Sequence, residues 1–123
     1  MRYDARIHWT GSTGLGWAHY DRTHTASAPP AEAEIGMTTG ESKGDPRLNN
    51  PEQLLVMAAC SCQMLWFLHL AAKARIDVVE YTDEAAGEMP ETTFTRIVLR
   101  PCIVVASQDA SEGADTQARR ARP

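Results

Sequence analysis

The stretch from Asn50 to Arg75 constrains the fold most, because it is long, apolar and begins with residues typical of a helix start. Its sequence is NPEQLLVMAACSCQMLWFLHLAAKAR. Asn50 is a favourable N-cap, Pro51 suits the first helical position, and Gln53 resembles the second half of a capping box. Basic residues near Arg75 suit the C-terminal end of the helix dipole. The sequence therefore predicts one helix of roughly 35 Å.

This predicted helix is apolar on nearly every face between Leu54 and Leu70, so it must be covered on all sides. A chain of 123 residues has too little material to wrap it alone. A membrane span is one alternative, because the run from Leu54 to Ala72 approaches the roughly 20 residues that cross a bilayer. Ser61 and Gln63 interrupt that run. We favour a homodimer in which two such helices pack together, with no membrane partner.

The composition is that of one soluble domain, with 43% hydrophobic residues. The net charge of −4 argues against nucleic acid as the main partner. Three cysteines form no disulfide-framework spacing, and the first residues lack the apolar core of a signal peptide. These features predict a cytoplasmic protein with a thiol available for chemistry.

The segments on either side of the helix predict an α+β fold. Before it, residues 3–10 alternate as a half-buried strand, residues 17–25 form a second strand, and residues 35–37 form a short third one. The prolines within residues 26–34 indicate an extended link, and residues 38–49 a polar loop. After the helix, residues 76–81 and 85–89 predict strands joined by a turn at 82–84, and residues 92–105 predict a stronger strand.

The end of the chain differs in composition. Pro101 interrupts the last predicted strand and suggests an edge or a bulge there. From Ser107 onward no large apolar residue occurs, which predicts a disordered tail. We therefore expect one domain over residues 1–106 and a polar tail over residues 107–123.

Two cysteines lie in the middle of the predicted helix, at positions 60 and 62. A helical step of two residues separates their directions by about 200°, so Cys60 and Cys62 cannot share one site or form a local disulfide. Cys62 is too far from the N-cap for the helix dipole to activate it, so a lowered pKa would need a nearby cation. Lys43 and Arg47, in the preceding loop, are the candidates. Cys60 is interpreted as a packed core thiol.

Glu52 lies in the first turn of the predicted helix. Its carboxylate either complements the helix dipole or takes part in a functional site with the cysteine. Ten residues of helix, about 15 Å, separate it from Cys62. If two copies pack antiparallel across a two-fold axis near Met57, each Glu52 comes level with the partner's Cys62. His69 follows Cys62 by seven residues and is interpreted as a packed histidine. The spacing of the other histidines matches no metal motif, so no metal is expected.

The segment NPEQLL followed by a helix cysteine at Cys62 resembles the OsmC/Ohr family of thiol-dependent hydroperoxide reductases. The run CQMLWFLHLAAKA is similar to an OsmC-like subgroup, as are SKGDPRLNNPEQ before it and YTDEAAGEM after it. The similarity covers about residues 3–105.

The resemblance implies an intertwined α+β homodimer with active sites at its interface and no cofactor. It implies that Cys62 is the peroxidatic cysteine and that Glu52 belongs to its polar network. That network normally includes an arginine, and in the subgroup an arginine commonly stands where Lys43 stands here. The family continues into a second helix with a resolving cysteine, which the stretch from Ser107 does not resemble. Cys102 precedes that helix and does not match the resolving cysteine.

The expected activity is reduction of an organic hydroperoxide by Cys62, with an external thiol as reductant and Cys102 as the alternative group that could resolve the oxidised sulfur. Apolar neighbours of Cys62 in the sequence favour a hydrophobic peroxide over hydrogen peroxide. The alternative is a catalytically impaired OsmC-like protein that is kept as a dimeric structural or small-molecule-binding module.

Overall fold

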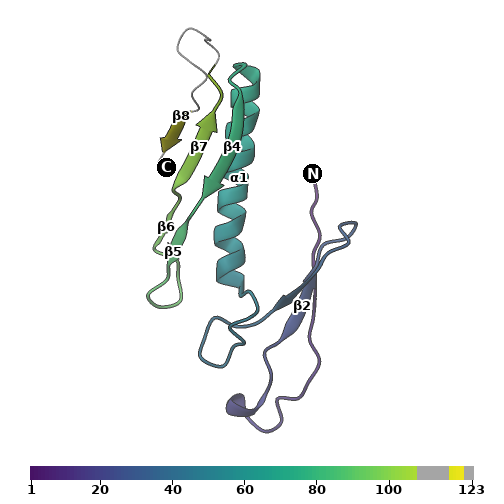
Figure 1. Ribbon diagram of the computed structural model, residues 1–123. Helices are drawn as coiled ribbons and strands as arrows, with labels where there is room; N and C mark the ends of the chain where they lie inside the picture. The colour runs from purple at the N-terminus through teal and green to yellow at the C-terminus, as the bar shows by residue number, and fades with distance from the viewer. Residues whose placement is uncertain (108–116, 121–123) are drawn as a thin grey trace. The chain divides into compact units, whose positions relative to one another are not determined.

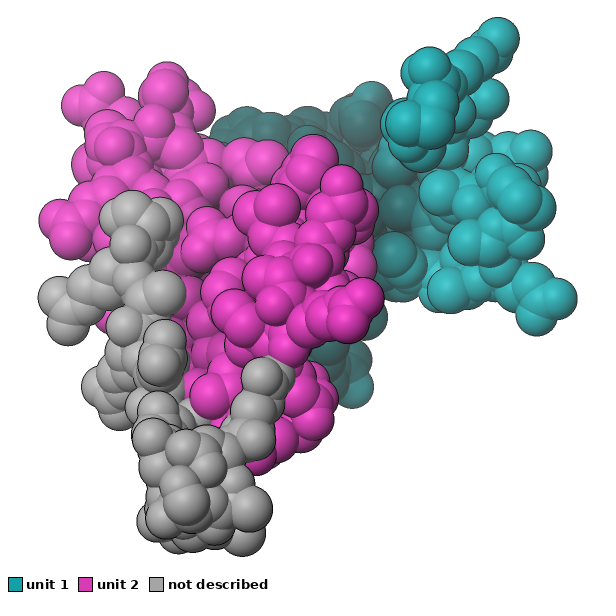
Figure 2. All heavy atoms as spheres, turned by 90° about the horizontal axis from the view of Figure 1, so that it is seen from above, with its two compact units in different colours: residues 1–54 teal, residues 55–123 magenta. Residues whose placement is uncertain are grey.

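The computed structural model describes residues 1–107 and 117–120, the latter by their backbone alone. The chain divides into two compact units, residues 1–54 and residues 55–123, shown in different colours in Figure 2. The first unit holds an antiparallel sheet and a polar loop. The second holds most of the one long helix and the remaining strands.

The sheet of the first unit has three antiparallel strands in the order β1-β2-β3. They are β1 (Arg6–His8), β2 (His24–Ser27) and β3 (Glu34–Met37). Ile7 faces Ala26 in the register of β1 with β2, and Thr25 faces Gly36 in that of β2 with β3. A cis peptide bond at Pro29–Pro30 lies in the connection between β2 and β3.

Two strand predictions in this unit are only partly right. The first strand is three residues long rather than eight, and its predicted buried face is exposed, with Ile7 at 62%. The segment predicted as the second strand, residues 17–25, begins with a 3₁₀ helix, η1 (Trp17–His19), and β2 starts only at His24. Strand length depends on the neighbouring strand, and β2 pairs with only three residues of β1. The short third strand is confirmed as β3.

The polar loop over residues 38–49 is confirmed and is folded back on itself. The Thr38 N–H donates to the carbonyl of Asn49 at 2.9 Å, and the Thr38 hydroxyl oxygen accepts the Asp45 N–H at 3.0 Å. A Cβ at Gly44 would lie 2.1 Å from the Thr39 carbonyl oxygen, so only glycine fits there. The loop thus returns the chain beside the end of β3, directly before the helix.

The helix α1 (Pro51–Lys73) has the ends that the sequence predicts. The Gln53 N–H donates to Asn50 Oδ1 at 2.9 Å, and the Asn50 N–H donates to Gln53 Oε1 at 3.1 Å, so the capping box is confirmed. At the other end, Arg75 has a φ of 58°, and the Ile76 N–H donates to the carbonyl of Ala71 at 2.9 Å. This bond is typical of a Schellman C-terminus.

The strands of the second unit form two small antiparallel sheets. One has the order β4-β7-β8, from β4 (Val78–Asp83), β7 (Pro101–Val105) and β8 (Gln117–Arg120). The other pairs β5 (Ala86–Glu88) with β6 (Arg96–Val98). Strands β4 and β7 run beside α1 (Figure 1), and the rings of Phe67 and Tyr81 are 5.9 Å apart across that layer. Among the side chains that the structure describes in this unit, the buried ones are Ala71, Leu99, Pro101 and Ile103.

Three boundaries in this unit differ from the predictions. The turn expected at 82–84 begins later, because β4 continues through Asp83. The long strand expected over residues 92–105 is two strands, with β7 starting at the buried Pro101. Within the expected tail, residues 117–120 form β8, because the edge of β7 offers backbone groups to any segment that can pair. The rest of the tail lies outside the described residues.

Helix α1 exposes most of its apolar surface. Ala71 is its one buried residue, whereas Leu65, Trp66 and Leu70 are each about 60% exposed. By length and composition alone, α1 is also long and apolar enough to cross a membrane. The homodimer expected from the sequence would cover this surface.

Candidate functional site

Cys62 lies in an open apolar hollow on α1. The hollow has a volume of about 330 Å³ and is lined by Cys62, Leu65, Trp66 and His69, which share one face of the helix at positions i, i+3, i+4 and i+7. The Cys62 thiol is free and its residue is exposed. The Trp66 and His69 rings meet edge to face with centroids 5.8 Å apart. The site therefore presents an accessible sulfur beside apolar and aromatic surface.

Cys60 has a different environment, as the helical geometry predicts. It is half-buried and lies next to Asp83 and Tyr81 of β4. Burial first, and then the charge of Asp83, raises the pKa of the Cys60 thiol. The same two causes raise the pKa of Tyr81. A thiol with a raised pKa is a poor nucleophile at neutral pH, which agrees with a structural role for Cys60.

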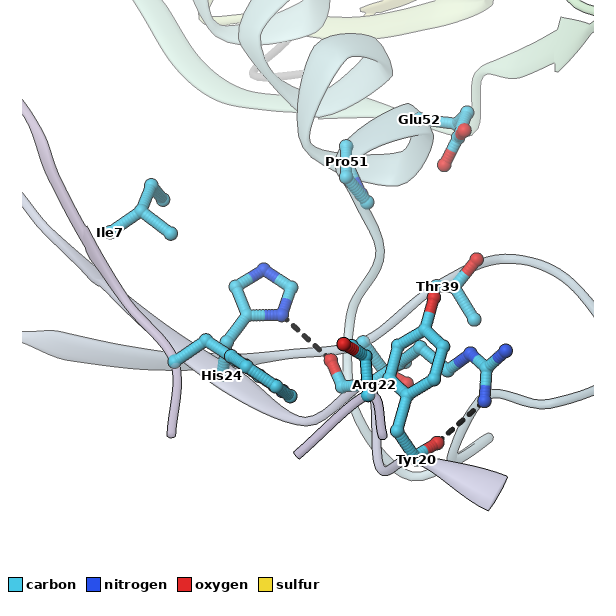
Figure 3. A pocket seen from close by; sticks show the side chains of 10 residues that line it. Ile7, Tyr20, Arg22, His24, Thr39, Pro51 and Glu52 are labelled. Atoms are coloured by element: carbon cyan, nitrogen blue, oxygen red, sulfur yellow. Dashed lines mark hydrogen bonds between the residues drawn. The ribbon is translucent and has the colours of Figure 1, made fainter. Parts of the chain in front are cut away.

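Glu52 lines a cavity of about 470 Å³ within the first unit (Figure 3). Its Oε2 atom is buried and has no hydrogen-bond partner among the described residues. A Cβ at Gly40 would lie 3.4 Å from that oxygen, so the loop backbone approaches it closely. The cavity is lined by Ile7, Trp9, Thr13, Tyr20, Arg22, His24, Thr38, Thr39, Pro51 and Glu52. An unpartnered carboxylate oxygen in an apolar cavity suits a ligand that donates a hydrogen bond.

Neither cation predicted from the sequence lines this cavity. The Lys43 ammonium lies 5.3 Å from the centroid of the Trp17 ring. Arg47 forms a two-point ion pair with Asp45, with its Nε and Nη2 atoms both 3.1 Å from carboxylate oxygens. Arg47 is therefore engaged within the loop, and Lys43 lies over an aromatic ring of η1.

Arg22 supplies the cation of the cavity, and it was not among the residues predicted from the sequence. Its guanidinium stacks on the Tyr20 ring at 3.7 Å and donates to the carbonyl oxygens of Tyr20 and Trp17. His24 Nδ1 lies 2.8 Å from the Arg22 carbonyl oxygen (Figure 3). Every second position from 20 to 24 holds one of these side chains, namely Tyr20, Arg22 and His24. In an extended segment such residues point to the same side, so this spacing was the sequence signal that could have predicted the group.

Cys102 lies on the side of the sheet that faces away from α1. It is paired in register with Thr82, whereas the neighbouring Tyr81 packs against Phe67 of the helix. Because adjacent strand residues point to opposite faces, the Cys102 thiol points away from the helix. Within one copy of the described chain, neither Cys60 nor Cys102 is placed to form a disulfide with Cys62.

No group of three or more metal-binding residues occurs among the residues that the structure describes. The chemistry that the side chains offer is that of a thiol and a carboxylate. Glu52 belongs to the first unit and Cys62 to the second, so each forms part of a site within its own unit.

Two comparisons with known proteins found matches. The family model for OsmC-like proteins matches residues 43–122, which include α1 and extend beyond residue 105. The chain is also similar to the solved structure of an OsmC-like protein of unknown function from Vibrio cholerae O1 biovar eltor. The two share 27% identity and a TM-score of 0.77, over 89% of this chain and 78% of that one. No curated protein matches the chain.

Proposed function

Because this chain belongs to the OsmC-like protein family, we propose that it reduces organic hydroperoxides through Cys62. The observation that carries the proposal is the exposed thiol of Cys62 within the hollow formed by Leu65, Trp66 and His69. An accessible sulfur next to apolar surface favours a peroxide with a hydrophobic body. Oxidative-stress defence in the cytoplasm is the corresponding role.

The proposed reaction is a two-electron transfer. The Cys62 thiolate attacks the terminal oxygen of the hydroperoxide, a sulfur–oxygen bond forms, and the oxygen–oxygen bond breaks. The alkoxide takes up a proton and leaves as an alcohol, while Cys62 becomes a sulfenic acid. An external thiol then condenses with the sulfenic acid, releasing water, and a second thiol reduces the mixed disulfide.

The proposed active unit is a homodimer. One copy leaves the apolar surface of α1 exposed, and ten residues of helix hold its Glu52 about 15 Å along the axis from its Cys62. An antiparallel pair of helices centred near Met57 would overlap over about residues 51–63 and bring Glu52 of one copy to Cys62 of the other. The unpartnered Glu52 Oε2 would accept a hydrogen bond from the peroxide, and Arg22 would supply positive charge to the same cavity.

The test follows the oxidation of Cys62 itself. Purified protein is mixed with tert-butyl hydroperoxide and a sulfenic-acid trap, and each cysteine is assigned by mass spectrometry. We expect trapping at Cys62 in the wild type and in Cys60→Ser, with none in Cys62→Ser. Glu52→Gln should slow trapping about tenfold or more, because a charged acceptor is replaced by a neutral one. Equal trapping at Cys60 and Cys62 would contradict the proposal.

A second candidate function is a dimeric binding module without turnover. The position of Cys102 on the outer face of the sheet favours it, because no second thiol within one described copy is placed to resolve Cys62. In that case Cys62 would show no peroxide-dependent trapping, although the protein would still elute as a dimer. A monomer on sizing would remove the proposed role of Glu52.

A further inference from the structure

A second cavity lies between α1 and β4, on the side of the helix that carries Cys60. It has a volume of about 490 Å³. It is lined by Val56, Met57, Cys60, Ser61, Met64, Tyr81, Asp83, Glu84 and Ala85. None of its lining residues belongs to the hollow around Cys62. The reduction of hydroperoxides makes no use of it.

Two buried polar atoms in this cavity have no hydrogen-bond partner among the described residues, namely Tyr81 Oη and Asp83 Oδ2. Both side chains are held in place by their other contacts. Asp83 Oδ1 accepts the Arg100 N–H at 2.7 Å, and the Tyr81 ring packs on Phe67. Gln63 lies near the phenol and the Cys60 thiol lies near Asp83, but neither forms a hydrogen bond of good geometry with the two unpartnered oxygens. Buried oxygens without partners are costly, so the cavity is incomplete without a donor.

The charges around the cavity select the kind of donor. Asp83 and Glu84 line it, and no lysine, arginine or histidine does. Burial raises the pKa of both Cys60 and Tyr81, so at neutral pH the thiol and the phenol add no charge. A ligand that places positive charge beside Asp83 Oδ2 is favoured over a neutral or anionic one.

The apolar part of the lining selects the body of the ligand. The side chains of Val56, Met57 and Met64 come from one stretch of α1, and thioethers adapt to irregular shapes. The volume is many times the roughly 30 Å³ that one water molecule occupies in the liquid. A single water molecule would therefore leave most of the apolar surface uncovered.

We propose that this cavity binds a small organic cation, a primary aliphatic amine in its ammonium form. The ammonium group donates to Asp83 Oδ2 and Tyr81 Oη, and the alkyl chain packs against Val56, Met57 and Met64. Binding does not depend on the proposed peroxidase activity, because Cys62 lies on another side of α1.

The probe is n-hexylammonium, with 1-hexanol and hexanoate as neutral and anionic probes of the same chain length. Methyl NMR of the full-length protein follows Met57 and Met64, with Met37 of the first unit as an internal reference. We expect saturable shifts of Met57 and Met64 with the amine, at least tenfold weaker binding of hexanol, and no binding of hexanoate. Met37 should not shift.

The matched variants are Asp83→Asn and Glu80→Gln. Asp83→Asn keeps an oxygen for the Arg100 N–H but removes the free carboxylate, and should weaken amine binding at least tenfold. Glu80 is an exposed carboxylate on the same strand and does not line the cavity, so Glu80→Gln should change affinity less than twofold. Should Asp83→Asn fail to fold, Tyr81→Phe removes the second acceptor while keeping the ring, and should weaken binding severalfold.

Two results would overturn the proposal. One is equal affinity for hexanol and hexylammonium, which would make the cavity merely apolar. The other is a shift of Met57 and Met64 that follows protein concentration and not amine concentration, which would mean that a second copy of the chain fills the cavity.

Discussion

The two faces of α1 that carry Cys60 and Cys62 differ in almost every property that governs a thiol. Cys62 is exposed among Leu65, Trp66 and His69, whereas Cys60 is half-buried beside Asp83 and Tyr81. The two residues are neighbours in sequence but lie about 200° apart around the helix. The strands of the second unit therefore cover one face of α1 and leave the other available to a partner.

Phe67 and Trp66 are adjacent residues that lie on these different faces. Replacing either one should change the stability of the protein more than any other substitution considered below. Phe67 packs on Tyr81 but is only half-buried, so Phe67→Ala should lower the free energy of unfolding by about 2–3 kcal/mol at every protein concentration, less than the roughly 3–5 kcal/mol of a fully buried phenylalanine. Trp66 is 62% exposed, so Trp66→Ala should lower stability mainly by weakening the dimer. Its effect should therefore grow as the protein is diluted.

Urea unfolding at two protein concentrations, about a hundredfold apart, checks this comparison. Leu15→Ala serves as the control, because Leu15 is an exposed apolar residue of the first unit. If Trp66→Ala and Phe67→Ala cause equal losses that do not depend on concentration, then both faces are packed within one copy and the dimer is not needed.

The second expected effect concerns thiol reactivity. At pH 7.5, iodoacetamide should alkylate Cys62 more than tenfold faster than Cys60, because Cys62 is exposed and the raised pKa of Cys60 leaves less thiolate. Peptide mass spectrometry after timed quenching measures both rates in one sample. Unfolding in urea should bring the two rates close together, and comparable rates in the folded protein would contradict the assignment of the two faces.

The parts of the fold that were predictable from sequence are those set by local interactions. The N-terminal end of α1 follows from the capping box of Asn50 and Gln53, which forms within a few residues. The opposite directions of Cys60 and Cys62 follow from the helical period alone. The α+β class and the family were likewise predictable, the latter from the spacing between Asn50 and Cys62.

The parts that were not predictable depend on segments distant in sequence. Arg22 shares a cavity with Glu52 because β2 and the polar loop come together, and no local pattern shows that. Lys43 and Arg47 were nearer in sequence but are held by Trp17 and Asp45. β8 was missed because pairing with an edge strand uses backbone groups, which a polar composition does not reveal.

The weakest effect should be the pH dependence of the protein's stability that arises from Cys60 and Tyr81. Burial and Asp83 raise the folded-state pKa of Cys60, so the folded protein holds this proton more tightly than the unfolded chain does. Its contribution to stability is fully present below the pKa of an unburied thiol, about 8.5, and is lost as the pH rises through the folded-state pKa. Tyr81 contributes in the same direction above about pH 10.

Urea unfolding between pH 7 and 11 measures this slope in the wild type and in matched variants. Cys60→Ser should flatten the decline that begins near pH 8.5, and Tyr81→Phe should flatten the part above about pH 10. Cys62→Ser is the control, because it removes a thiol from the exposed face. A decline that Cys62→Ser removes and Cys60→Ser leaves unchanged would place the buried thiol on the other face of α1, and would reverse the comparison between the two cysteines.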